Sequence, residues 1–162
     1  MSARDFWEYA SFVVTALALP FAIVFFAWEQ RKERDNEEEE GYQLLSNAYI
    51  DFLKVVLAHP DLRLRSSEPL CDPSAEQRER THVIFDMLVS LFERAYLVAY
   101  KPSMSDTEAR RWNSWDDYMH EWCDREDFRA ALPLLLRGED PEFQRYLRRI
   151  ADEQRGTFVE SV

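Results

Sequence analysis

Two pairs of side chains have the types and the spacing of metal ligands. Each pair is a carboxylate followed three residues later by a histidine, which puts both on one side of a helix. The pairs are Glu79 with His82 and Asp117 with His120. Ferritin-like bundles hold two metal ions with two such pairs and two more carboxylates from other helices. Only Asp51 and Glu93 suit that role, and Glu93 shares a predicted helix with Glu79, so the set is incomplete.

A zinc site is the second metal hypothesis. Its ligands would be His120 and Cys123, completed by Cys71 and His59. Zinc sites usually contain Cys and His residues that are closely spaced in the sequence, and this chain lacks such spacing. It also lacks the nucleophile-elbow, phosphate-loop, dinucleotide-binding and HExxH motifs. We therefore expect no catalytic residue, metal or cofactor, and a metal-dependent enzyme is a minor alternative.

An aromatic cluster is the most distinctive candidate site. The segment "WNSWDDYMHEW" spaces its rings for one helix face, and aromatic residues of the preceding helix fall at matching positions. The members are Phe92, Tyr96, Tyr100, Trp112, Trp115, Tyr118 and Trp122. Such rings form either a packed core or a cage for a cation or flat ligand. Helical spacing favours the core.

Glu93 is the one carboxylate predicted to be partly buried, because "FERAY" places it beside an apolar helical stripe. A buried carboxylate needs a basic partner. Arg110 and Arg111 of the next helix are the candidates, and we expect a structural ion pair that sets helix register rather than general-acid chemistry.

The elements that position these residues are predicted to be helices. Glycine occurs only three times, and helix-forming residues dominate. Tyr42, Leu45, Tyr49, Phe52 and Val56 recur at steps of three and four, which makes one apolar face. That face packs either on its own domain or on a parallel second copy.

Helix ends are predicted from local chemistry. Ser74 with Gln77 and Ser105 with Glu108 have capping-box spacing, and Asp140 precedes Pro141 as a helix start does. The sequence therefore predicts an all-α bundle of about five helices over residues 42–156. Gly156 is expected to end the last helix, leaving 157–162 as a frayed tail.

Residues 9–28 contain no charge and are long enough to cross a lipid bilayer as a helix. Aromatic residues lie at both ends of this span, as they do at membrane interfaces. Pro20 interrupts the middle and predicts a kink. A cleaved signal peptide is the rival, but the apolar run continues past "ALA" into a basic cluster. We expect a transmembrane helix that contacts membrane lipid through residues 9–28 and runs on into the first helix of the bundle.

The charge distribution predicts an orientation. Arg31, Lys32 and Arg34 follow the apolar span, whereas only Arg4 precedes it. Bases favour the cytoplasmic side, so residues 1–8 would form an outside tail and 29–41 a charged juxtamembrane helix. Residues 35–162 hold 27 acids and 16 bases, which accounts for the net charge of −11 and disfavours nucleic-acid binding.

The motifs "LAHPDL", "FERAYLVAY", "W..W..YM..W" and "F..YL..I", in this order, resemble a group of uncharacterised bacterial single-pass membrane proteins. The resemblance covers roughly residues 42–150. It implies a small cytosolic helical domain of unknown function at the bacterial inner membrane. It implies no activity and no active-site residues.

The expected function is a membrane-tethered interaction module that docks a membrane or cytosolic protein, or that forms a homo-oligomer. The alternative is a membrane-anchored sensor or effector, as in stress or phage defence, that binds a small ligand at the aromatic cluster. Neither assignment requires catalysis.

Overall fold

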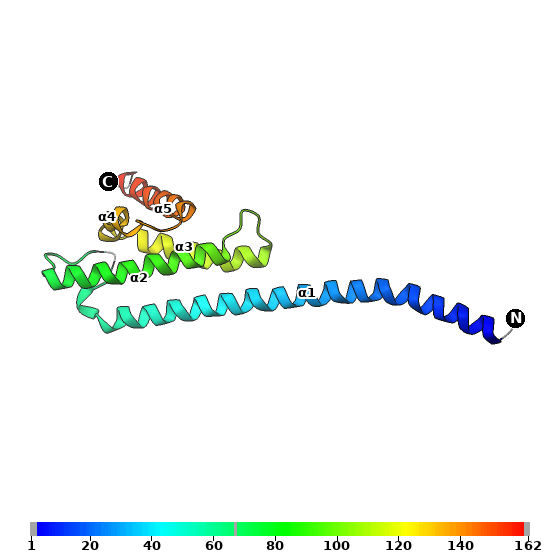
Figure 1. Ribbon diagram of the computed structural model, residues 1–162. Helices are drawn as coiled ribbons and strands as arrows, with labels where there is room; N and C mark the ends of the chain where they lie inside the picture. Colours follow the sequence, from blue (N-terminus) through cyan, green and yellow to red (C-terminus); the bar gives the residue numbers. More distant parts are fainter. Residues whose placement is uncertain (1–2, 67, 161–162) are drawn as a thin grey trace. The chain divides into compact units, whose positions relative to one another are not determined.

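The computed structural model describes the backbone of residues 3–66 and 68–160, and the side chains of residues 25–155 with gaps at 31, 34–38 and 67. Over the described backbone the chain is all-α, with six helices and no strand (Figure 1). They are α1 (Ala3–Ala58), the short 3-10 helix η1 (Pro60–Leu62), α2 (Ala75–Ala99), α3 (Asp106–Cys123), α4 (Glu126–Leu135) and α5 (Pro141–Glu160). The chain divides into two units, Met1–Gly41 and Tyr42–Val162.

The predicted transmembrane helix is not supported. Among the described residues, none of the helices combines the length and the apolar character needed to cross a membrane. In the sequence, ten of the twelve residues from Glu29 to Glu40 are charged, so this part of α1 is too polar to cross a membrane. A span needs about 20 apolar residues in a row. The predicted single-pass inner-membrane location is therefore wrong. The predicted lipid contact through residues 9–28 stays a prediction, because the side chains of residues 9–24 lie outside the described residues.

The residues that predict a membrane span and its orientation lie in the first unit. Pro20, Arg31 and Arg34 have side chains outside the described residues, so the predicted kink and most of the basic cluster lie there too. The Lys32 side chain lies over an aromatic ring, with its Nζ 5.7 Å from the centre of the Trp28 ring. Trp28 itself is 59% exposed. With the span removed, the bases no longer define an orientation.

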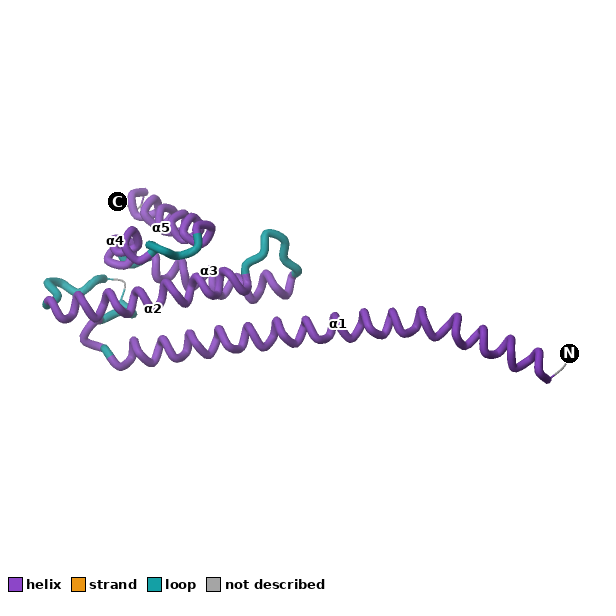
Figure 2. The backbone as a smooth tube through the Cα atoms, in the orientation of Figure 1, coloured by secondary structure: helices purple, strands orange, loops and turns teal. Residues whose placement is uncertain are grey.

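The second unit is a helical bundle, as predicted. Helix α2 contacts α3, α4 and α5, and α3 contacts α4 and α5 (Figure 2). Its central place follows from its sequence, because apolar residues cover more than one side of this helix. The buried residues of α2 include Leu88, Val89 and Phe92, none of which has any exposed surface.

The apolar face at the end of α1 packs within its own bundle. Leu45, Tyr49, Phe52 and Val56 are all buried in the single core that also holds the aromatic residues of α3. The intramolecular alternative is therefore correct, and this face is not available as the seam of a parallel dimer.

The predicted helix starts are confirmed. Ser74 Oγ accepts from Gln77 N at 3.2 Å, and Gln77 Oε1 accepts from Ser74 N at 3.0 Å. Ser105 and Glu108 repeat this capping box at the start of α3. Asp140 Oδ1 accepts from the backbone N of Phe143 at 2.9 Å. These caps satisfy amide groups that have no partner inside the helix.

One helix end differs from the prediction. Helix α5 continues through Gly156 to Glu160, so this glycine does not end it. Helix α4 contains Pro133 in its interior. The turn between α4 and α5 depends on Gly138, whose φ of +93° is a conformation that side chains with a Cβ rarely adopt.

Candidate functional site

Six of the seven residues of the predicted aromatic cluster, all except Phe92, divide into two groups of touching rings. The first joins α1, α2, α3 and α4 and contains Tyr49, Phe52, Phe85, Trp115, Tyr118, Trp122 and Phe128. The second joins α2, α3 and α5 and contains Tyr96, Tyr100, Trp112, Phe143 and Tyr146. Phe92, Trp115 and Trp122 are each at most 2% exposed. The predicted residues therefore lie mainly in the core.

The second group reaches the surface at one hollow of about 350 Å³. Tyr96, Tyr100 and Tyr146 line it, together with Arg145 and Arg149 of α5. A hydrogen bond fixes the position of the Tyr146 side chain, because its hydroxyl donates to Asp116 Oδ1 at 2.6 Å. A ligand would reach the rings of the cluster here. Ligand binding by the cluster stays a prediction.

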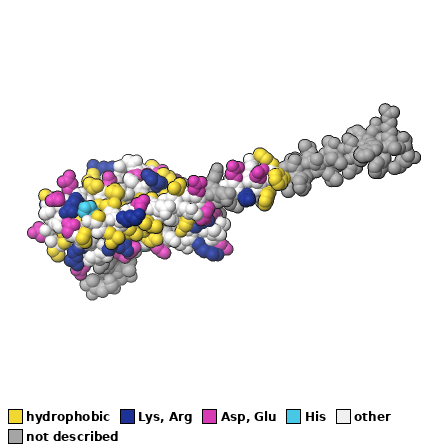
Figure 3. Space-filling view, turned by 90° about the horizontal axis from the view of Figure 1, so that it is seen from below, with side chains coloured by type: hydrophobic (Ala, Val, Ile, Leu, Met, Phe, Trp, Pro, Cys, Tyr) yellow, Lys and Arg dark blue, Asp and Glu magenta, His cyan; other side chains and the backbone are white. Residues whose placement is uncertain are grey.

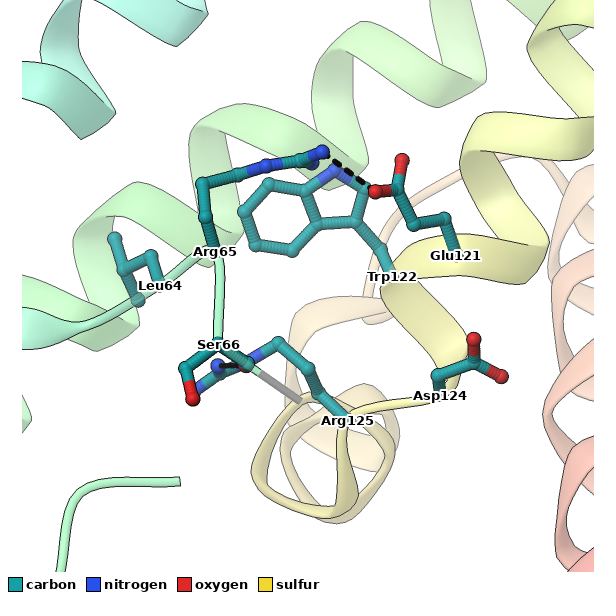
Figure 4. Close-up of a pocket in the computed structure, with 7 residues that line it drawn as sticks. All are labelled: Leu64, Arg65, Ser66, Glu121, Trp122, Asp124 and Arg125. Atoms are coloured by element: carbon teal, nitrogen blue, oxygen red, sulfur yellow. Dashed lines mark hydrogen bonds and ion pairs between the residues drawn. The ribbon is translucent and has the colours of Figure 1, made fainter. Parts of the chain in front are cut away.

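A second hollow, of about 210 Å³, lies where the 59–74 connection crosses the end of α3 (Figure 4). The Arg65 guanidinium extends over the Trp122 ring, 5.8 Å from its centre. Its Nη2 donates to Glu121 Oε1 at 2.5 Å. Trp122 is thus covered by an arginine whose charge is met by the neighbouring carboxylate.

Arg125 closes the other side of this hollow and is the one charged residue buried among those described, at 3% exposure. Its Nη1 donates to the backbone O of Arg63 at 3.1 Å and also to that of Ser66. Its Nη2 lies 2.7 Å from Asp127 Oδ2. The guanidinium therefore fastens the 59–74 connection to the junction of α3 and α4. Its Nε is buried without a partner among the described atoms, so an acceptor in the hollow, such as water, would satisfy it.

The residues proposed as metal ligands do not come together. Among the described side chains, no three of the types His, Cys, Asp or Glu are grouped as a metal ion requires. His120 Nδ1 lies 2.8 Å from the backbone O of Asp116. Cys71 is exposed and Cys123 is buried. Burial raises the pKa of Cys123 to about 12, so this thiol is protonated at neutral pH and is a poor nucleophile.

Glu93 has a different partner from the one expected. It accepts a hydrogen bond from the backbone N of Asp140, the cap of α5. Arg111 instead lies over the ring of Tyr42, 5.5 Å from its centre, and Arg110 is exposed. Glu93 therefore ties α2 to the start of α5.

Glu139 lies beside Glu93, and this proximity has an electrostatic consequence. Burial, then a hydrogen bond with Glu93 and its negative charge, raise the pKa of Glu139 to about 7. Ser90 Oγ, at 3.4 Å, donates to Glu139 Oε1 and opposes this rise. Asp86 of α2 adds a further negative charge. The carboxyl group of Glu139, in the turn between α4 and α5, therefore changes between its protonated and its charged form near neutral pH.

We expect the stability of the chain to fall as the pH rises through 7. The folded-state pKa of Glu139 lies above its ordinary value of 4.5, so the folded state binds the proton more tightly. This contribution is complete below pH 4.5 and is lost as the pH passes about 7. The melting temperature should be about 2–5 °C lower at about pH 8 than at about pH 5. Glu139→Gln should remove most of this difference, whereas Glu142→Gln, at an exposed position of α5, should retain it.

Sequence reasoning missed both Arg125 and Glu139. Arg125 stands in the charged run "DREDFR", where every neighbour suggests solvent exposure. Its backbone partners are 59 and 62 residues away along the chain. The only local signal for Glu139 is its position just before the cap Asp140, which does not show that α2 supplies a second carboxylate.

These features define the chain as an all-α bundle protein with an aromatic core and an arginine-fastened connection. Comparison with known proteins adds no relative, since no family model, curated protein or solved structure matches it. The resemblance to bacterial membrane proteins stays a prediction for residues 42–150.

Proposed function

We propose that this chain is a non-catalytic helical module that works by binding another protein. The observation that supports this proposal is the location of the exposed apolar side chains. In the second unit, the large hydrophobic residues that are exposed number eight among the described residues, and seven belong to α1 or α2. They are Leu44, Ile50, Leu57, Val83, Met87, Leu97, Val98 and, on α4, Leu134.

The charge on α2 fits this role. This helix carries four acids and three bases, although the chain as a whole has a net charge of −11. The exposed apolar residues of α2 are flanked by charges of both signs, as the core of a protein interface is surrounded by a polar rim. The face of the bundle in Figure 3 shows hydrophobic side chains in groups between charged ones. An exposed apolar surface of this kind marks a binding site more often than a surface of scattered single residues does.

Site-specific photo-crosslinking in living cells tests the proposal. We expect a photoreactive phenylalanine analogue at Val83 or Val98 to give the same discrete adduct. The analogue at Leu134, which is 49% exposed on α4, serves as the matched control and should give none. Met87→Glu should abolish the Val98 adduct, because it puts a charge in the centre of the interface.

Two outcomes would contradict the proposal. One is the absence of any adduct at Val83 and Val98. The other is equal labelling at Leu134, which would mean that the analogue reacts wherever it is exposed.

A further inference from the structure

One face of α2 carries a stripe that we call the α2 stripe: Val83, Met87, Arg94 and Val98. At 3.6 residues per turn these four fall within about 60° of one another around the helix. Val83 is 54%, Met87 44% and Val98 54% exposed. The stripe is about 22 Å long, at about 1.5 Å per residue. Nothing among the described residues buries these three apolar side chains.

The α2 stripe is symmetric along the helix. Val83 and Val98 lie equally far from the point between Ser90 and Leu91, and so do Met87 and Arg94. If two copies of α2 met antiparallel about that point, each valine would face the other valine of the second copy. Each Met87 would face the Arg94 side chain, whose methylene groups pack well on a thioether. A two-fold interface requires this self-complementarity.

The charges match as well. Arg94 and Asp86 are both exposed, and neither has an ion pair or hydrogen bond within the described chain. Asp86 instead contributes negative charge to the region of Glu139. In the antiparallel arrangement, Arg94 of one copy faces Met87 of the other, and Asp86 is the residue directly before Met87. The arginine is long enough to reach that carboxylate, so two ion pairs form across the axis.

We infer that the α2 stripe binds the α2 stripe of a second copy of this chain in antiparallel orientation, with Arg94 of each copy paired to Asp86 of the other. This inference rests on the proposed function, because it names the protein that the face binds. One helix pair buries less than the roughly 800 Å² per partner of a standard interface. The dimer is therefore weak, with a Kd in the range of about 1–100 μM.

Charge exchange at the two positions tests the inference. Sedimentation of the full-length chain over about 2–200 μM, which brackets the expected Kd, should show a reversible monomer–dimer equilibrium. Asp86→Arg and Arg94→Asp should each raise the Kd by about tenfold or more, because each puts like charges opposite one another. The double variant should restore the Kd to within about threefold of the original. Leu134→Glu should leave it unchanged.

Circular dichroism verifies that each variant is folded, and both substituted side chains are exposed. A chain that stays monomeric at every concentration overturns the inference. A dimer whose Kd is the same in both single charge variants as in the original chain overturns it as well. In either case a Val98 adduct to a different protein would leave the proposed function standing. Loss of that adduct altogether would remove both.

Discussion

Replacing Trp122 by alanine is expected to lower the free energy of unfolding by about 3–5 kcal/mol. Trp122 is 2% exposed and touches rings from three other helices: Phe52 at 5.7 Å, Phe85 at 6.3 Å and Phe128 at 6.2 Å between ring centres. Its Nε1 donates to Tyr49 Oη at 3.4 Å. Alanine would leave a cavity at the point where α1, α2, α3 and α4 meet, and four separate helices cannot all move inward to fill it.

Urea unfolding followed by far-ultraviolet circular dichroism measures this loss without using tryptophan emission, which the substitution itself changes. Trp28→Ala provides the control, since Trp28 is 59% exposed in the first unit. It should lower the free energy of unfolding by less than about 0.5 kcal/mol. A loss below about 1 kcal/mol for Trp122→Ala would show that this ring is not part of a packed core.

Arg125→Met is expected to lower the free energy of unfolding by about 3 kcal/mol. Breaking a buried ion pair usually costs about 3–5 kcal/mol, because the remaining charge stays uncompensated. The lower end applies here, since the Asp127 side chain is 30% exposed and water can reach it. The backbone carbonyls of Arg63 and Ser66 lose their donor as well.

A second measurement separates this role from general destabilisation. With its fastening removed, the 59–74 connection should be cut by trypsin after Arg63 and Arg65 faster than the rest of the folded chain. Arg125→Met combined with Asp127→Asn should recover part of the stability, because no unpaired charge remains. The control is Arg145→Met, whose side chain is 74% exposed in a surface pair and should cost about 0.5 kcal/mol or less. An unchanged cleavage pattern would contradict the role assigned to Arg125.

Local chemistry explains why much of the fold was predictable. Ser74, Ser105 and Asp140 cap helices through partners two or three residues away, so their roles are visible in any short window of sequence. The apolar face of Tyr49 and Phe52 follows from spacing alone. Neither kind of pattern says which helix lies opposite, and the division of the aromatic cluster into two groups was therefore not predictable.

The errors have physical causes too. The membrane span was predicted from an uncharged stretch, the aromatic residues at its ends and the basic cluster that follows it, but among the described residues none of the helices is long and apolar enough to cross a membrane. The expected pairing of Glu93 with an arginine assumed that a buried carboxylate needs a side-chain base. A backbone N–H at the start of α5 supplies the hydrogen bond instead. Gly156 was expected to stop α5, yet a helix tolerates an internal glycine at a cost of about 1 kcal/mol.

The contact between Tyr49 and Trp122 joins positions 73 residues apart, and this has a consequence for biosynthesis. A ribosome adding about 5–20 residues per second takes roughly 4–15 s to cover that distance. During this interval the tyrosine and phenylalanine rings of α1 have been made, while the indole that covers them in the folded bundle has not. The apolar face of α1 therefore stays without its aromatic cover until α3 has been synthesised, so this part of the bundle core forms late during synthesis.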